Sequence, residues 1–275
     1  MKSNNPVFQR SEAFNGTSHQ SYAGDPATWG TGTPGMPTHQ APVERMTIDS
    51  VVQKTAISLG VVFAAAIVTW MMTPDLRDPS ANLGPLIGAI TIGSLAAFGL
   101  SMVNAFKKVV SPPLVLAFAV AEGIALGALS KLFDAQFSSP DGGSIVTQAV
   151  LGTFAAFAGT LAAYKFFNIQ VGAKFRTFVI AAVFGMIGLS LLEMLLGAFG
   201  NQFGLFGFGA MGMLFAVAGL VLGIFMLILD FDFVEKGIAA GIEERESWRA
   251  AFAMTVSLVW IYTNLLRLLA IFNQD

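Results

Sequence analysis

Four long stretches of the sequence contain no charged residue, and they constrain the fold more than any other feature. They cover residues 55–74, 79–106, 142–164 and 194–229, whereas a helix that crosses the hydrocarbon core of a bilayer needs only about 20 apolar residues. Of the 275 residues, 55% are apolar and 12% are charged, against roughly 25% charged in an average soluble domain. The sequence therefore predicts a protein that crosses a membrane several times.

The apolar stretches divide into seven expected helical spans. Thr47 or Asp49 can cap the first turn of a helix that starts near residue 47 and continues into the first span. The segment lengths and the lack of alternating polarity exclude a membrane β-barrel. We therefore expect an all-α integral membrane protein, with a seven-helix transmembrane domain over residues 46–275. The expected spans are 53–72, 82–104, 112–132, 144–166, 177–199, 209–229 and 248–272.

The N-terminal segment differs in composition from the rest of the chain. Residues 1–45 are rich in Ser, Asn, Gly, Pro and Thr and show no periodic pattern. Such a segment buries too little apolar area to offset the entropy lost on ordering. We expect residues 1–45 to form a disordered cytoplasmic tail.

The distribution of Lys and Arg near the span ends predicts the orientation. Ten lie on the side of the N-terminus and three on the opposite side, and loops rich in Lys and Arg stay in the cytoplasm. We therefore expect a multi-pass protein of the cell inner (cytoplasmic) membrane, with the N-terminus in the cytoplasm and the C-terminus outside. The ten are Arg45, Lys54, Lys107, Lys108, Lys165, Lys174, Arg176, Lys236, Arg245 and Arg249, and the three are Arg77, Lys131 and Arg267.

The composition excludes several functional classes. The chain has no Cys, and its two histidines, His19 and His39, lie in the N-terminal segment. Thiolate metal sites, haem ligation and Ser-His catalysis therefore lack their usual residues at membrane depth. The net charge of -2 gives no basic excess for nucleic acid. We expect a non-enzymatic protein without a resident cofactor, surrounded by the lipid bilayer.

A charged side chain at the bilayer centre costs about 2.5–3.5 kcal/mol on insertion scales, so ionisable groups within spans are candidate functional residues. Glu122 lies about ten residues into the third expected span, near the midplane. One interpretation is a protonated carboxyl that is hydrogen-bonded to a neighbouring helix, and the other is a cation or proton site. The remaining candidates are Glu193, Asp230, Asp232 and Arg267.

Glu193 and Arg267 are expected at similar depth. Glu193 follows Arg176 by 17 residues and Arg267 follows Arg249 by 18, which at about 1.5 Å per residue places both in the outer half. They can form an ion pair between the fifth and seventh spans. Alternatively, Arg267 extends alone to the outer headgroups.

Asp230 and Asp232 close the sixth expected span, and Glu235 follows them. Residues two apart on a helix do not share a face, so at most one Asp points into the bundle. The three acids are either a solvated charge run at a helix end or, because Phe231 and Phe233 alternate with the two Asp residues, a functional acidic cluster.

Taken with their neighbours, these residues resemble the Bax inhibitor-1 (transmembrane Bax inhibitor motif, YccA-like) family, in particular a bacterial branch with a long N-terminal tail. The resemblance extends over nearly the whole chain, and its strength lies in the order and placement of the motifs. The segments that carry it are 3–8 (SNNPVF), 46–55 (MTIDSVVQKT), 111–113 (SPP) with 121–123 (AEG), 229–235 (LDFDFVE) and 265–269 (LLRLL).

The resemblance implies a bundle whose last helix is surrounded by the other six. It also implies a pH-sensitive calcium leak, in which two Asp residues on the sixth and seventh helices share a proton and control the pore. The chemistry is consistent, because two close carboxylates cannot both ionise cheaply. Calcium also prefers oxygen ligands of this kind.

The chain departs from the family pattern at the second Asp. Asp232, with Asp230 as the second choice, matches the first Asp of the family, while the position ten residues before Arg267 is Ser257. The bacterial branch often has an acid three residues before the Arg, and here that residue is Asn264. Because neither ionises, we expect Asp232 to work with Glu122, Glu235 or another partner.

Two functional hypotheses follow. The first is a passive leak for calcium or another cation, with a cytoplasmic calcium site and gate at Asp230 and Asp232 and a mid-membrane acid at Glu122. The second is a non-conducting membrane protein that binds or regulates a membrane protease or another membrane complex, with the N-terminal tail as its point of attachment.

Overall fold

The computed structural model describes residues 44–76, 82–138 and 143–274. Over these ranges the regular elements are helices and no strand is formed, and an isolated antiparallel bridge joins Arg45 to Glu243. The predicted disordered tail falls almost wholly on residues 1–43, outside the described residues. The helices are α2 (Ile48–Met72), α3 (Gly84–Phe106), α4 (Pro112–Phe137), α5 (Ile145–Phe166), α6 (Ala173–Ala198), α7 (Ala210–Ala239), the 3-10 turn η2 (Glu244–Glu246) and α8 (Ser247–Phe272).

The seven predicted spans are confirmed, since the described residues contain seven helices long and apolar enough to cross a membrane. Thr47 caps α2 as expected: its hydroxyl accepts from the Ser50 amide at 3.1 Å, and the Ser50 hydroxyl accepts from the Thr47 amide at 3.1 Å. α7 continues beyond the expected end at residue 229 to Ala239. This extension carries the acids of the 229–235 segment, which find partners on neighbouring helices.

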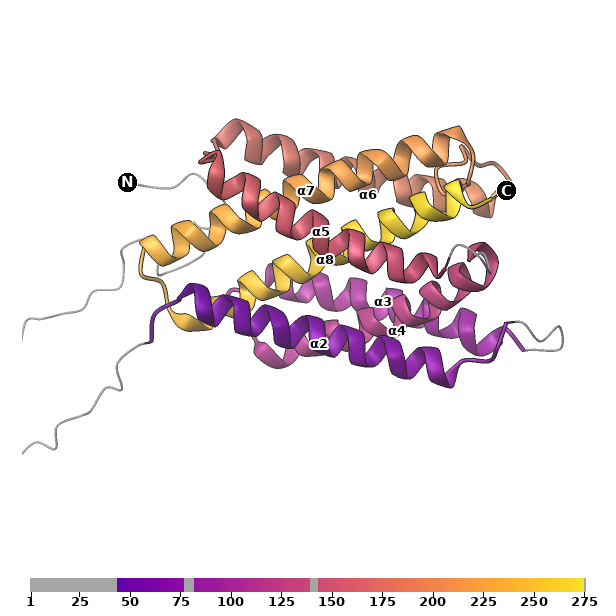
Figure 1. Ribbon diagram of the computed structural model, residues 1–275, viewed down its shortest axis with the longest axis horizontal. Coiled ribbons are helices and arrows are strands. Elements are labelled where there is room, and N and C mark those ends of the chain that lie inside the picture. The colour runs from indigo at the N-terminus through magenta and orange to yellow at the C-terminus, as the bar shows by residue number, and fades with distance from the viewer. Residues whose placement is uncertain (1–43, 77–81, 139–142, 275) are drawn as a thin grey trace, which may run out of the picture.

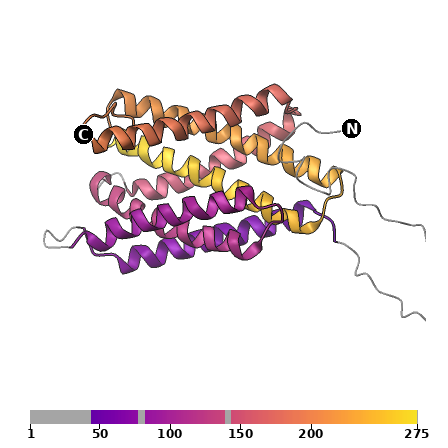
Figure 2. The ribbon, with the colours of Figure 1, turned by 180° about the vertical axis from the view of Figure 1, so that it is seen from behind.

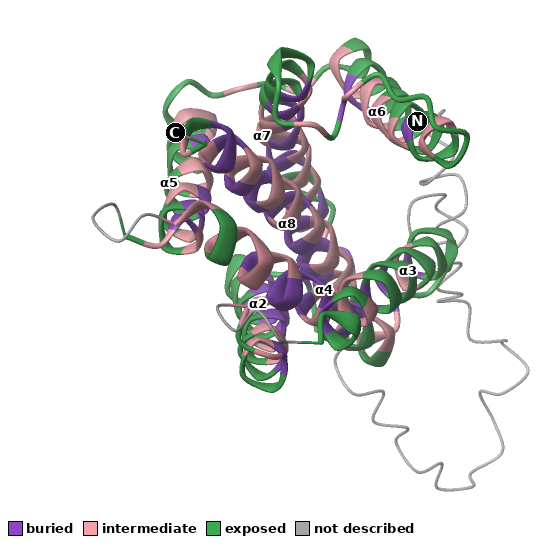
Figure 3. Cartoon of the chain, turned by 90° about the vertical axis from the view of Figure 1, so that its right-hand side faces the viewer, coloured by how far each residue is buried: buried purple, intermediate pink, exposed green. Residues whose placement is uncertain are grey.

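The helices run side by side, and α8 lies between two groups of them (Figures 1 and 2). α8 packs against α2, α4, α5 and α7, whereas α3 packs chiefly on α4 and α6 on α7. The expectation that all six other helices surround α8 is therefore not confirmed, because α3 and α6 occupy outer positions (Figure 3). We call the end where α2 and α8 begin the near end, and the opposite end the far end.

Glycines set the closest helix contacts. A Cβ added at Gly123 or Gly127 of α4 would collide with the backbone of α2 at Val62 or Ala66. Small residues four apart let helix backbones approach in this way. The contact holds α4 against α2, and so fixes which face of α4 turns toward α8.

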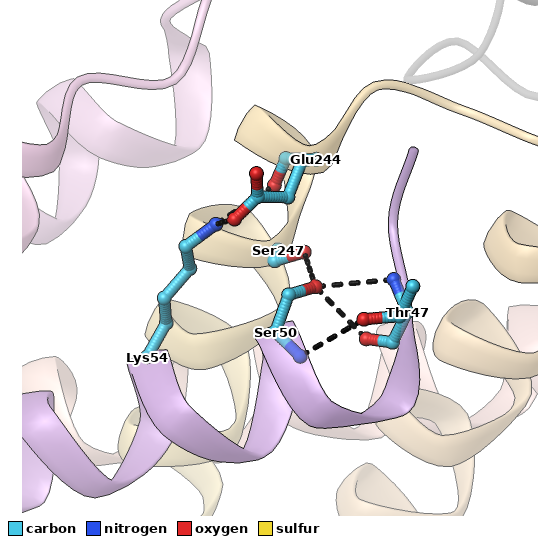
Figure 4. Close-up of polar contacts among 5 residues, drawn as sticks. All are labelled: Thr47, Ser50, Lys54, Glu244 and Ser247. Atoms are coloured by element: carbon cyan, nitrogen blue, oxygen red, sulfur yellow. Dashed lines mark hydrogen bonds and ion pairs between the residues drawn. The ribbon is translucent and has the colours of Figure 1, made fainter. Parts of the chain in front are cut away.

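Polar contacts tie the start of α8 to the start of α2 at the near end (Figure 4). The Ser50 and Ser247 hydroxyls lie 2.7 Å apart, and the Lys54 ammonium lies 2.5 Å from the Glu244 carboxylate. The residues just before α2 also pair with the linker before α8, since the Met46 amide donates to the Ile242 carbonyl at 2.8 Å. Glu244 also raises the pKa of the Glu44 carboxyl, by hydrogen bonding and by its charge. These contacts fix the level of α8 relative to its neighbours.

Candidate functional site

Asp230 of α7 points toward α8. The Ser257 hydroxyl donates to the Asp230 carboxylate at 2.6 Å. Asp230 has no ion-pair partner within 4.0 Å in the described part of the chain. A neutral hydroxyl orients this carboxylate without cancelling its charge.

Glu122 lies on the face of α4 that turns toward α8. Phe118, one turn earlier, packs against Phe252 of α8 at a ring distance of 5.1 Å, and Leu126, one turn later, joins a cluster with Tyr262. Positions four apart share one helix face, so Glu122 shares this one. The side chain is partly buried, and within the described ranges it has no hydrogen-bond or ion-pair partner.

Glu122 and Asp230 lie at the same level of the bundle. The Phe118–Phe252 contact and the 2.6 Å contact between Ser130 and Tyr262 show that α4 and α8 run in the same direction. Glu122 comes four residues after Phe118 and Ser257 five after Phe252, so at 1.5 Å per residue the two are offset by only about 1.5 Å along the helices. Two acids from different helices, without a basic partner among the described residues, therefore lie at one level beside α8.

Asp232 has a different environment, although it follows Asp230 by only two residues. Its carboxylate is 2.9 Å from the Arg176 guanidinium of α6 and 2.7 Å from the Lys236 ammonium one turn further along α7. The Asp232 side chain is 4% exposed. Asp232, the first choice for the family's first Asp, is thus held by two cations on the α6 side, and the open question of which Asp faces α8 is answered by Asp230.

The three expected gate partners, Ser257, Glu235 and Asn264, make three different contacts. Ser257 does face an acid of α7, namely Asp230. Glu235 accepts from the Tyr164 hydroxyl of α5 at 2.6 Å. Asn264 donates to the Trp260 carbonyl of its own helix at 2.8 Å and packs against Gly219. Within the described part of the chain, none of these three residues binds Asp232.

Glu193 and Arg267 both bind the segment between α6 and α7. The Glu193 carboxylate accepts from the backbone amides of Phe203, Gly204 and Leu205 at 2.8–3.0 Å. Arg267 donates to the carbonyls of Leu205 and Gly207. The direct ion pair, one of the two arrangements considered, is not formed among the described residues. Both side chains instead bind the backbone of the segment between α6 and α7. Arg267 does not extend alone toward the far headgroups either.

The calcium site expected at Asp230 and Asp232 is not assembled as a pair, because the two carboxylates face α8 and α6 respectively. Over the described ranges, no three His, Asp or Glu side chains gather in a way that could hold a metal ion. The geometry instead provides two separate acids around α8. Such an arrangement can attract a passing cation without binding it tightly.

The comparison with known families matches the chain over residues 5–274 to a family described as Bax inhibitor 1 like. The chain belongs to this family. No match was found among curated proteins. The match covers all seven helices of this Bax inhibitor 1 like protein, so the fold and the acids around α8 are both within it.

Family membership clarifies the contact between α7 and α8. The resemblance implied an Asp at the position of Ser257, and that position lies within hydrogen-bonding distance of Asp230. At this position the chain therefore has a hydroxyl where the resemblance implies a carboxyl. Sequence reasoning missed both cationic partners of Asp232, namely Arg176 and Lys236. The four-residue spacing from Asp232 to Lys236 was a readable signal for the second of them.

Proposed function

We propose that this protein is a passive, pH-sensitive leak for cations, with calcium as the transported substrate. Asp230 and Glu122 would form the acidic level that a cation passes beside α8. The proposal includes no chemical reaction and no resident cofactor.

The observation that carries the proposal is the pair of acids at one level without a basic partner among the described residues. An uncompensated carboxylate at membrane depth is costly, and such residues commonly mark ion pathways. A protein that needed only packing would be expected to neutralise both acids, as it neutralises Asp232. Protonation of either carboxyl would change the charge that a cation meets, so pH sensitivity follows from the same two residues.

The test is calcium flux into proteoliposomes across a pH series, with protein-free vesicles as the control. We expect protein-dependent flux that changes with pH. Equal flux in empty and protein-containing vesicles at every pH would contradict the proposal. It would favour the non-conducting alternative, in which the protein binds a membrane protease or another membrane complex.

We further propose that the protein lies in the cytoplasmic membrane with its near end in the cytoplasm. Basic residues at the near end, such as Lys54, Lys108 and Arg176, support this orientation. Because the chain has no Cys, single Cys residues can be introduced directly. In intact cells, an impermeant maleimide should label Gln202→Cys at the far end and leave Lys108→Cys unlabelled until the membrane is opened. The reverse pattern would contradict the orientation.

A further inference from the structure

A hollow of about 320 Å³ opens on the side of the bundle between α2 and α5. α2 and α5 form its walls, and α4 and α8 form its floor. Figure 3 shows α2 and α5 on the same flank of α8. Phe63 and Phe154 stack across the hollow at a ring distance of 6.2 Å. The hollow thus interrupts the surface of a bundle that crosses a membrane.

The lining offers almost nothing polar to a ligand. The Ser130 and Tyr262 hydroxyls bond to each other at 2.6 Å, and the Thr153 hydroxyl donates to the Ala149 carbonyl at 2.7 Å. The hydroxyls are therefore satisfied within the protein. Burial of apolar surface is the interaction left for an occupant, which points to a hydrocarbon chain.

The length of the hollow fits one leaflet. Along α2 the lining extends from Leu59 to Met71, which is about 18 Å at 1.5 Å per residue. Half of a hydrocarbon core of about 30 Å is about 15 Å. The hollow lies in the half of α2 closer to the far end, so one acyl chain of the leaflet on that side would run along it.

The Lys131 side chain lies at the far end of the hollow. The Lys131 ammonium donates to the Trp70 carbonyl at 2.7 Å and to the Thr73 carbonyl at 2.6 Å, and Trp70 is itself part of the lining. These bonds use two of its three N–H groups in the described part of the chain. The ammonium therefore lies where the phosphate of a lipid with its chain in the hollow would be.

We propose that this groove holds one acyl chain of a membrane phospholipid, whose phosphate lies near Lys131. The inference does not depend on ion conduction, so the two proposals can fail separately.

The test is photo-crosslinking in proteoliposomes with a phospholipid that carries a diazirine in its acyl chain, followed by mapping of the adducts by mass spectrometry. We expect adducts concentrated on lining residues such as Val150 and Tyr262. Adducts spread evenly over the lipid-facing surface would overturn the proposal.

Two neighbouring residues of α5 provide a matched pair of variants. Val150 lines the groove, whereas Leu151 is 65% exposed and lies outside it. Val150→Trp should lower the groove adducts about tenfold, a difference of 1.4 kcal/mol in affinity, whereas Leu151→Trp should leave them unchanged. Equal labelling of the two variants would overturn the proposal.

Two further measurements keep the proposal falsifiable if Val150→Trp fails to fold. On the unaltered protein, a phospholipid probe should give more groove adducts than a diacylglycerol with the same chain, because only the phospholipid carries a phosphate that can lie near Lys131. It should also give more than a free fatty acid with the same diazirine. A higher yield from the fatty acid, or equal yields from the phospholipid and the diacylglycerol, would overturn the assignment of a phospholipid with its phosphate at Lys131.

Discussion

The acids on the α6–α7 side bind cations or several backbone amides, whereas those beside α8 have at most one neutral partner among the described residues. Asp232 is held by Arg176 and Lys236, and Glu193 accepts three backbone amides. Among the described residues, Asp230 has only the Ser257 hydroxyl as a partner, and Glu122 has none. Charges of the first kind join α6 and its connecting segment to α7, whereas charges of the second kind remain available to a cation. Loss of the first should therefore affect stability, and loss of the second should affect transport.

The largest effect is expected at Glu193, whose side chain is buried with its three backbone donors. Glu193→Ala leaves those amides without an acceptor and should destabilise the fold by about 3–5 kcal/mol. The midpoint of thermal unfolding in detergent measures this loss, with Ser190→Ala on the same helix as the control. Equal midpoints for the two variants would show that Glu193 is not structural.

The next largest effect is expected at Arg176. Arg176→Ala leaves the nearly buried Asp232 with Lys236 alone and should cost about 1.5–3 kcal/mol. Lys174→Ala is the matched control, because Lys174 is exposed in the same helical turn. If Asp232→Asn is added, the double variant should recover part of the loss, since the uncompensated carboxylate is gone. A double variant less stable than Arg176→Ala would contradict this assignment.

Ser257 tests the weaker contact beside α8. Ser257→Ala removes one hydrogen bond to Asp230 and should cost about 1 kcal/mol or less. A loss as large as that of Arg176→Ala would show that Asp230 is a structural residue like Asp232, and the contrast between the two acids would fail.

Substitution of Glu122, unlike the three substitutions above, should not lower the stability of the fold. Because Glu122 has no partner among the described residues, Glu122→Gln should leave the free energy of unfolding unchanged or raise it by less than about 1 kcal/mol. The midpoint of thermal unfolding in detergent measures this change. A clear fall in the midpoint would mean that its carboxyl supports the fold.

The elements were predictable because local signals define them. The cap at Thr47 and the charge-free stretches gave the start of α2 and all seven spans. The acids were only partly predictable. That Asp230 and Asp232 face different ways follows from helix geometry, but which one faces α8 depends on the rotation of α7 about its axis. That rotation depends on packing against α8, where Gly219 and Gly223 lie close to Asn264 and Ile261.

The partner of Glu193 depended on the backbone of a connecting segment. Gly204 adopts a φ of +80°, which favours glycine, and the amides of residues 203–205 converge on one carboxylate. Similar depth suggested Arg267 as the partner of Glu193, and depth alone could not reveal that the segment lies between them. Arg176 also escaped notice, because it is 56 residues from Asp232 in the sequence.

The central claim is that Asp230 serves transport while Asp232 serves structure. Its most direct test is calcium flux per folded protein in proteoliposomes that contain Asp230→Asn or Asp232→Asn. The account predicts that Asp230→Asn changes flux about tenfold, a barrier change of about 1.4 kcal/mol, with little change in the unfolding midpoint. It predicts that Asp232→Asn lowers the midpoint and leaves flux per folded protein near that of the unaltered chain. Unchanged flux in Asp230→Asn, or equal changes in both variants, would contradict it.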